Sequence, residues 1–374
     1  MPVPLDEFPL HQAPLSLAYP ASSDRNFYDR AYFNAHDRTG DIFLISGYGI
    51  YPNLGVTDAF VTVGTGTRHV TARTSDALLA DNDRLHPTVG PYRIEVVEPL
   101  QKLRIISDTA EYGVGCDITW TGSFPAIDEP SHVMRQGGRV ILDAMRFAQV
   151  GTWEGTIHVE GRDITVTPDT WLGTRDRSWG IRPVGEAEPP GRGAAEGGDD
   201  FGLWWVYVPL RFDDFALVVI VQEDANGHRI LNEARRVWPA ASGRPPEQLG
   251  WPEVTIHYRP GTRESTGATL VLRERDGTPV TVEVESLGAV ALNCGPGYGG
   301  DPDWSHGQWR GRGWVEGAVI DTADPAVAGR VTFGVVDHVA RAAVDGTVGY
   351  GLYEHGTIGL HRPSGFTDFF SVAP

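Results

Sequence analysis

The stretch Trp171-Leu172-Gly173-Thr174-Arg175-Asp176-Arg177-Ser178-Trp179-Gly180-Ile181-Arg182-Pro183 holds more chemically active side chains than any other part of the chain. It contains three arginines, one aspartate and two tryptophans. In an extended strand, successive side chains point to opposite faces. We therefore expect Arg175, Arg177 and Trp179 on one face of a strand, and Asp176 and Ser178 on the other.

Two interpretations of this segment are open. It could be a structural clamp that joins two halves of the protein, because buried ion pairs with stacked aromatic rings often serve this purpose. It could instead belong to a ligand site, because perturbed charged groups gather at such sites. Either way, a charge that is buried requires a partner.

Length and charge exclude several classes of protein. The chain has 374 residues, enough for two or three domains, and 41% of them are hydrophobic, enough for a sizeable core. Its net charge of −18 repels phosphate backbones, so we expect no nucleic-acid partner. No apolar run is long enough to span a bilayer, and the N-terminus lacks a signal-peptide pattern. We expect a cytoplasmic protein, with an oligomer possible and the pairing of Cys116 with Cys294 left open.

The chain predicts an all-β fold. Its 46 glycines and 27 prolines are spread among short hydrophobic runs, as in a protein of many strands and tight turns. Evenly spaced strands favour a sandwich or an up-and-down barrel. Two similar halves suggest two barrels side by side, residues 1–183 with an extended N-terminal arm and residues 184–374. The second half would begin with a flexible loop over residues 185–200, which are rich in Gly, Pro, Ala and acidic residues. Residues 138–147 are ambiguous between helix and strand, and residues 329–337 are expected to be a strand.

Motifs for common cofactors do not occur. The sequence has no phosphate-binding loop, no dinucleotide fingerprint, no nucleophile elbow and no metal-ligand spacing of histidines or cysteines. We therefore expect no cofactor and no metal. The twelve histidines are scattered, and His306, next to Trp304 and Ser305, is a candidate for contact with a substrate more than for metal ligation. A barrel with none of these motifs most naturally holds a small apolar ligand.

The central segment carries a family resemblance. Residues 173–180, Gly-Thr-Arg-Asp-Arg-Ser-Trp-Gly, resemble the Asp-Trp-Gly signature of the carotenoid 1,2-hydratase (hydroxyneurosporene synthase) and AttH-like superfamily, which includes kievitone hydratase-like proteins and fungal Diels–Alderases. Residues 25–53 and 349–354 look like the ends of bacterial members. The resemblance implies two tandem lipocalin-like barrels with a site for an apolar, often prenyl-bearing or polyene ligand. Arg177 stands where the commoner form of the signature has histidine, so a proton shuttle through that position is not expected.

The resemblance implies an enzyme whose reaction stays open. Fold alone does not determine function. One hypothesis is a cofactor-independent lyase or hydratase acting on an isoprenoid, polyene or similar apolar substrate. The alternatives are a pericyclase or isomerase, in which the pocket only shapes the substrate, and a carrier that binds lipid without turnover.

Hydration of an alkene requires a carboxyl that an apolar pocket keeps protonated. Glu354, in an aromatic and glycine-rich run, is the first candidate acid. Asp176 is the second, provided that strand alternation turns it away from its arginine neighbours. Ordinary packing is the alternative role for each remaining candidate. The substrate-binding candidates are Arg175, Arg177, Trp179, Trp205, Tyr207, Tyr32, Tyr51, Tyr353 and His306.

Overall fold

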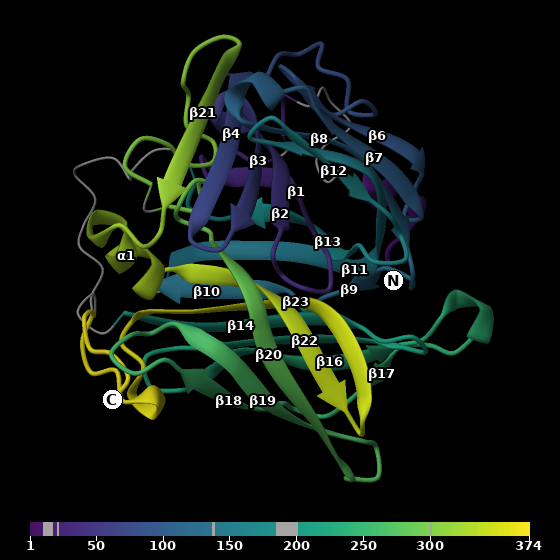
Figure 1. Cartoon of the computed structure of the whole chain (residues 1–374), viewed down its shortest axis with the longest axis vertical. Helices are drawn as coiled ribbons and strands as arrows, with labels where there is room; N and C mark the ends of the chain where they lie inside the picture. The colour runs from purple at the N-terminus through teal and green to yellow at the C-terminus, as the bar shows by residue number, and fades with distance from the viewer. Residues whose placement is uncertain (10–17, 21, 137–138, 185–200, 300) are drawn as a thin grey trace.

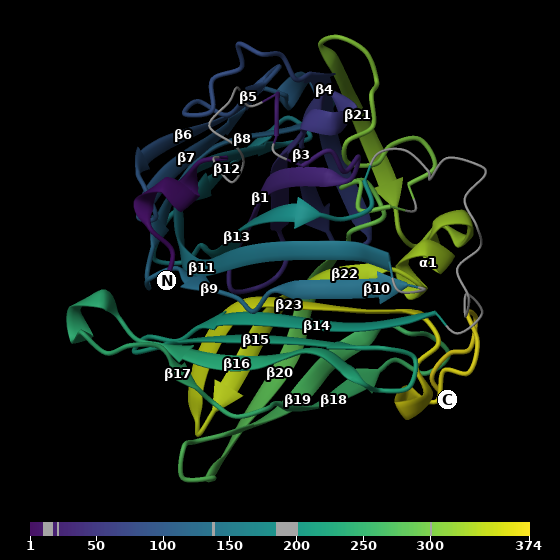
Figure 2. The same ribbon diagram turned by 180° about the vertical axis from the view of Figure 1, so that it is seen from behind.

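The computed structural model describes the chain except for residues 10–17, 21, 137–138, 185–200 and 300 (Figure 1). The predicted loop over residues 185–200 therefore lies outside the described residues. The described part consists of two antiparallel sheets packed face to face, which confirms the predicted all-β, lipocalin-like fold (Figures 1 and 2). No helix within it is long and apolar enough to cross a membrane.

The first sheet is built mainly from the N-terminal half. Along its edge-to-edge path the strands are β21 (Trp314–Asp321), β4 (Arg68–Ala77), β3 (Val56–Thr65), β2 (Phe43–Tyr51), β1 (Phe27–His36), β13 (Leu172–Ile181), β11 (Arg139–Val159), β8 (Val114–Gly122), β7 (Lys102–Ser107), β6 (Tyr92–Glu98) and β5 (Thr88–Val89). Strands β9 (Ile127–Asp128), β10 (His132–Gln136) and β12 (Arg162–Val166) also pair with β11. Strand β21 comes from the C-terminal half and pairs with β4. One strand from beyond the predicted boundary at residue 183 therefore belongs to the first sheet.

The second sheet lies against strands β11 and β13 of the first. Its order is β17 (Glu247–Gln248), β16 (Arg229–Val237), β15 (Ala216–Glu223), β14 (Gly202–Arg211), β23 (Thr347–Gly359), β22 (Val335–Val344), β20 (Pro279–Ala291), β19 (Ser265–Arg273) and β18 (Glu253–Tyr258). Each sheet encloses its own apolar core, and a third buried cluster, which includes Phe60, Ile45, Trp205 and Leu352, fills the space between the sheets.

Strand pairing and a helix cap decide the secondary structure of two segments, residues 138–147 and residues 329–337. The ambiguous residues 138–147 lie within strand β11 where the structure describes them, because this strand pairs with β13 and β10 over that range. The strand expected over residues 329–337 is wrong in its first part. Helix α1 (Pro325–Thr332) occupies it, because the side chain of Asp324 caps the Ala326 amide at 2.9 Å and Pro325 suits a first helical turn. Strand β22 begins only at Val335.

Short 3-10 turns complete the described part. They are η1 (Pro4–Glu7), η2 (Pro52–Leu54), η3 (Ala110–Tyr112), η5 (Ala240–Ser242) and η6 (Arg362–Ser364). The first of them departs from the predicted extended arm, because it turns Glu7 into the first sheet, where this side chain is 3% exposed. Cys116 and Cys294 are both buried and free.

The arginines of β13 form a clamp around that turn. Arg175 binds both carboxylate oxygens of Glu7, at 2.5 and 2.8 Å, and its Nε donates to Gln149 at 2.9 Å. Arg177 donates to Asp29 and, at 2.5 Å, to the backbone oxygen of Glu7. The clamp interpretation therefore holds for these two residues, but the clamp joins the N-terminal segment to the first sheet and does not join two halves of the protein.

Candidate active site between the two sheets

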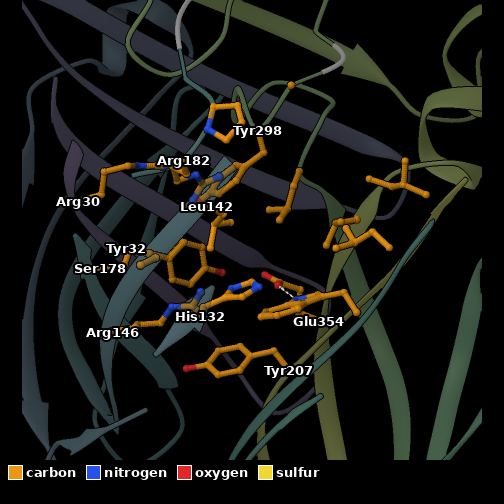
Figure 3. A pocket seen from close by; sticks show the side chains of 18 of the residues that line it. Arg30, Tyr32, His132, Leu142, Arg146, Ser178, Arg182, Tyr207, Tyr298 and Glu354 are labelled. Atoms are coloured by element: carbon orange, nitrogen blue, oxygen red, sulfur yellow. Dashed lines mark hydrogen bonds between the residues drawn. The ribbon is translucent and has the colours of Figure 1, made fainter. Parts of the chain in front are cut away.

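A cavity of about 540 Å³ lies between the sheets. Its walls come from β1, β10, β11 and β13 on one side, from β14 and β23 on the other, and from the segments around residues 292–299 and 333–335. Apolar side chains, among them Leu142, Leu203 and Leu352, line the walls together with a small set of charged and aromatic groups. Figure 3 shows Leu142 among these groups. This volume and composition are those of a site for a small organic molecule.

Asp176 reaches the cavity by strand alternation. Strand β13 turns Asp176 and Ser178 toward the cavity, and Arg175 and Arg177 point the other way into the clamp, as expected from the sequence. Tyr32 of β1 lies directly opposite Asp176 in the strand register and lines the cavity with it. Burial raises the pKa of Asp176 to about 7, and the nearby carboxyls of Glu129 and Glu354 act in the same direction, against Arg146 and Arg30. Near neutral pH this carboxyl can therefore both give and take a proton.

Glu354 belongs to a pair of carboxyls. It lies directly opposite Asp337 across β22 and β23, and its charge acts on the Asp337 carboxyl. Burial and the charge of Glu354 raise the pKa of Asp337 well above its usual range, so Asp337 is the partner that keeps the proton. Asp337 is fully buried, whereas Glu354 lines the cavity.

Hydrogen bonds hold this pair in place. The Trp205 indole N–H donates to Glu354 Oε1, and the Tyr32 hydroxyl donates to Asp337 Oδ2. Tyr207 lies opposite Glu354 in the β14–β23 register and faces the same cavity. Glu354 thus lines the cavity, accepts a hydrogen bond from Trp205 and lies beside a carboxyl that keeps its proton, so it is placed to act as a base.

Cationic and aromatic groups surround the carboxyls. The Arg146 guanidinium lies 3.3 Å from Glu129 Oε2 and 5.6 Å from the ring centres of both Trp205 and Tyr207. The His132 ring stacks on Trp205 with centroids 5.9 Å apart. Burial, together with Arg146, lowers the pKa of His132 to about 3, so this imidazole is neutral and adds no charge to the cavity. Among the described residues, no group of three or more His, Cys, Asp or Glu is placed to hold a metal ion.

The structure brings five of the residues selected from the sequence together in this cavity. They are Asp176, Glu354, Tyr32, Trp205 and Tyr207. The other six do not line it. Besides the clamp arginines Arg175 and Arg177, they are Trp179, Tyr51, Tyr353 and His306.

Each of these last four residues has a structural setting elsewhere. Trp179 packs beside Phe147 on the clamp face of β13, since it shares the alternation of Arg175 and Arg177. Tyr51 packs with Tyr28 and hydrogen-bonds Asp58 at 3.2 Å. Tyr353 follows the opposite alternation to Glu354, lies in the core of the second sheet and bonds Ser265 at 2.7 Å. His306 is buried behind Arg30 and lies 2.6 Å from the Pro296 carbonyl oxygen.

Sequence reasoning missed several groups of the site. They are Arg30, Glu129, His132, Arg146, Arg182, Tyr298 and Asp337. Arg30 had a usable signal, because period-two alternation along β1 places Tyr28, Arg30 and Tyr32 on one face. Arg182 had one too, because it follows Asp176 and Ser178 in the same period-two alternation. The others are contributed by separate strands and loops, and no local pattern links them.

Comparisons with known proteins place the chain in a family. Over residues 3–367 the sequence matches a family described as "Family of unknown function (DUF8625)". The chain belongs to this family. A comparison with curated proteins by sequence finds no match.

Solved structures resemble this member of the DUF8625 family in fold. CghA, solved with and without the compound Sch210972, has a TM-score of 0.50 in both states. Sequence identity is 11% with the compound and 12% without it, over 90% of this chain and 89% of CghA. Kievitone hydratase from Nectria haematococca has a TM-score of 0.49 at 15% identity, over 87% of this chain and 88% of its own. At such identities the likeness to CghA extends to the fold alone.

Proposed function

We propose that the protein is a hydratase, or a hydro-lyase in the reverse direction, that adds water to a carbon–carbon double bond of an apolar, prenyl-like or polyene substrate. The observation that carries the proposal is the meeting of two unlike carboxyls, Asp176 and Glu354, in one largely apolar cavity. Two carboxyls that line one cavity in different surroundings are a common basis of acid–base catalysis.

The roles follow from the surroundings of each carboxyl. Asp176, with a pKa raised to about 7 by burial, donates its proton to an alkene carbon. A water molecule attacks the carbon that has become electron-poor, and Glu354 accepts the proton that this water loses. Trp205 and the protonated Asp337 hold Glu354 ready for that step. The product has gained one water, and exchange with solvent returns Asp176 to the acid form and Glu354 to the base form.

Aromatic rings support the cationic stage of this reaction. Trp205 and Tyr207 line the cavity next to Glu354, and their ring faces attract positive charge. His132, which stacks on Trp205, is neutral, so it places no positive charge beside the cationic stage of the substrate. The fold shared with CghA, which was solved with the compound Sch210972, agrees with a small organic ligand.

Oxygen-labelled water tests the proposal. We expect the wild-type protein, incubated at about pH 6 with prenyl-chain acids, alcohols and esters, to convert at least one of them to a product that contains one labelled oxygen, since Asp176 is mostly protonated at that pH. Glu354→Gln should reduce this conversion by about 10²- to 10⁴-fold, because the amide cannot accept the proton from water.

The outcomes separate the three hypotheses. Val97→Ala, an exposed change on β6, a strand that contributes no residue to the cavity, is the matched control and should keep full conversion. Conversion to an isomer without labelled oxygen, unaffected by Glu354→Gln, would overturn hydration in favour of a pericyclase. Tight binding with every compound recovered unchanged would overturn it in favour of a carrier.

A further inference from the structure

Arg30 is a buried cation without an acceptor. It lies on β1, is 4% exposed and lines the cavity. Its Nε and Nη1 atoms have no hydrogen-bond partner among the described residues. Leaving a cation unpaired in a protein interior is unfavourable. A side chain in this state indicates that something else supplies the acceptor.

His306, the side chain within hydrogen-bond distance of Arg30 in the described part of the chain, does not accept a proton from it. Nη2 of Arg30 lies 3.3 Å from His306 Nε2, and the same Nε2 lies 2.6 Å from the Pro296 carbonyl oxygen. A carbonyl oxygen only accepts, so Nε2 must carry the hydrogen and donate to it. It then has no lone pair to offer Arg30. His306 therefore supports Arg30 sterically and leaves its donors free.

Asp58, a carboxyl whose charge acts on Arg30, is already engaged. Its Oδ2 accepts from the Gly307 amide at 2.6 Å, and its Oδ1 accepts from Tyr51 at 3.2 Å. No ion pair joins it to Arg30 in the described part of the chain. Burial raises the pKa of Asp58 to about 7, so its negative charge is incomplete near neutral pH. The charge of Arg30 thus remains available to the cavity.

A second guanidinium stands at the same end of the cavity. Arg182 lies 5.8 Å from the ring centre of Tyr298, and Arg30 lies 4.8 Å from that same ring (Figure 3). The Tyr28 ring, 5.5 Å from Arg182, completes the enclosure. Within the described residues Arg182 makes no ion pair and lines the cavity. Figure 3 shows this group on one side, with Glu354 and Tyr207 at the other.

From this juxtaposition we infer that the cavity takes an amphiphile with a carboxylate head, which binds between Arg30 and Arg182 while the apolar chain runs toward Asp176 and Glu354. Guanidinium groups recognise carboxylates through paired, charge-assisted hydrogen bonds. Partial negative charge on Asp58 and Asp176 opposes a dianion more strongly than a monoanion, so a carboxylate head suits this end better than a phosphate. This inference rests on the proposed function in one respect, that the cavity is the substrate site. It adds the chemical class of the substrate to that proposal.

Binding of matched prenyl compounds tests the inference. Geranic acid, geraniol and methyl geranate share one apolar chain and differ in the head. We expect the wild-type protein to bind the acid about 10- to 100-fold more tightly than the alcohol or the ester in calorimetric titrations, in line with the value of a charge-assisted hydrogen bond. Arg30→Met should remove this preference and leave binding of the alcohol almost unchanged. Arg182→Met, at a half-buried position, should reduce the preference by a smaller factor.

A stability readout keeps the test informative. Because Arg30→Met removes an unpaired buried cation, we expect this variant to fold and to melt no lower than the wild type in the absence of ligand. Arg162→Met, at an exposed position on β12, is the control and should keep the full preference for the acid. Equal binding of acid and alcohol by the wild type, or an unchanged preference in folded Arg30→Met, would overturn the inference. Preferential binding of the acid without any turnover would leave it standing and would count against the hydratase proposal alone.

Discussion

Asp176→Asn is expected to lower the turnover number for water addition by about 10²- to 10⁴-fold, the usual contribution of a general acid. The amide keeps the size and much of the hydrogen bonding of the carboxyl but has no proton to give. Asp176 lines the cavity opposite Tyr32, so the change should leave the packing of β13 intact. The measurement is steady-state turnover of the compound that the oxygen-labelling experiment identifies.

The pH dependence gives the same prediction a second readout. Only the protonated form of Asp176 acts as the acid, and burial sets its pKa at about 7. The wild-type rate should therefore be high below neutral pH and fall as the pH rises through about 7. The residual activity of Asp176→Asn should not fall as the pH rises through about 7. Asp345→Asn, at an exposed turn, is the control and should match the wild type at every pH. Full activity in Asp176→Asn would remove this residue from the mechanism.

Glu7→Ala is expected to lower the free energy of unfolding by about 3–5 kcal/mol, because it leaves Arg175 as an uncompensated buried charge. Arg175 is 1% exposed, and both of its terminal nitrogens bind Glu7. Glu7 Oε2 also accepts from the Leu100 amide at 2.7 Å, so the substitution removes a second buried bond. Urea denaturation followed by tryptophan fluorescence measures the change.

A paired substitution separates lost charge balance from lost contact area. Combining Glu7→Ala with Arg175→Met should recover part of the lost stability, because no charge then remains unpaired. Glu111→Ala, at an exposed position, should shift stability by less than about 0.5 kcal/mol. If Glu7→Ala behaves like Glu111→Ala, the clamp contributes nothing to the fold and residues 4–7 are only surface contacts.

Period-two alternation accounts for what could be predicted of the site. Along β13 it separates Asp176 from Arg175 and Arg177, and along β23 it separates Glu354 from Tyr353; the structure follows both patterns. Alternation also predicts which residues share a face within one strand. It does not predict which faces of different strands meet.

The rest of the site depends on long-range packing. Glu7 and Arg175 are 168 residues apart in sequence, and no local pattern links them. The carboxyl pair of Asp337 and Glu354 requires the register of β22 against β23, which a shift of one residue would destroy. Arg146 reaches the cavity from β11. The sequence of residues 138–147 alone does not distinguish a helix from a strand.

The protonation of Asp176 is the central claim, and carbon-13 NMR of labelled aspartate side chains tests it most directly. The signal that disappears in Asp176→Asn should titrate with a midpoint of about 7 in the wild type. The Asp58 signal, which should also titrate near 7, must persist in that variant and serves as the internal reference. A midpoint for Asp176 near the ordinary value of 3.8 would contradict its role as the acid, because the carboxyl would then be ionised throughout the neutral range.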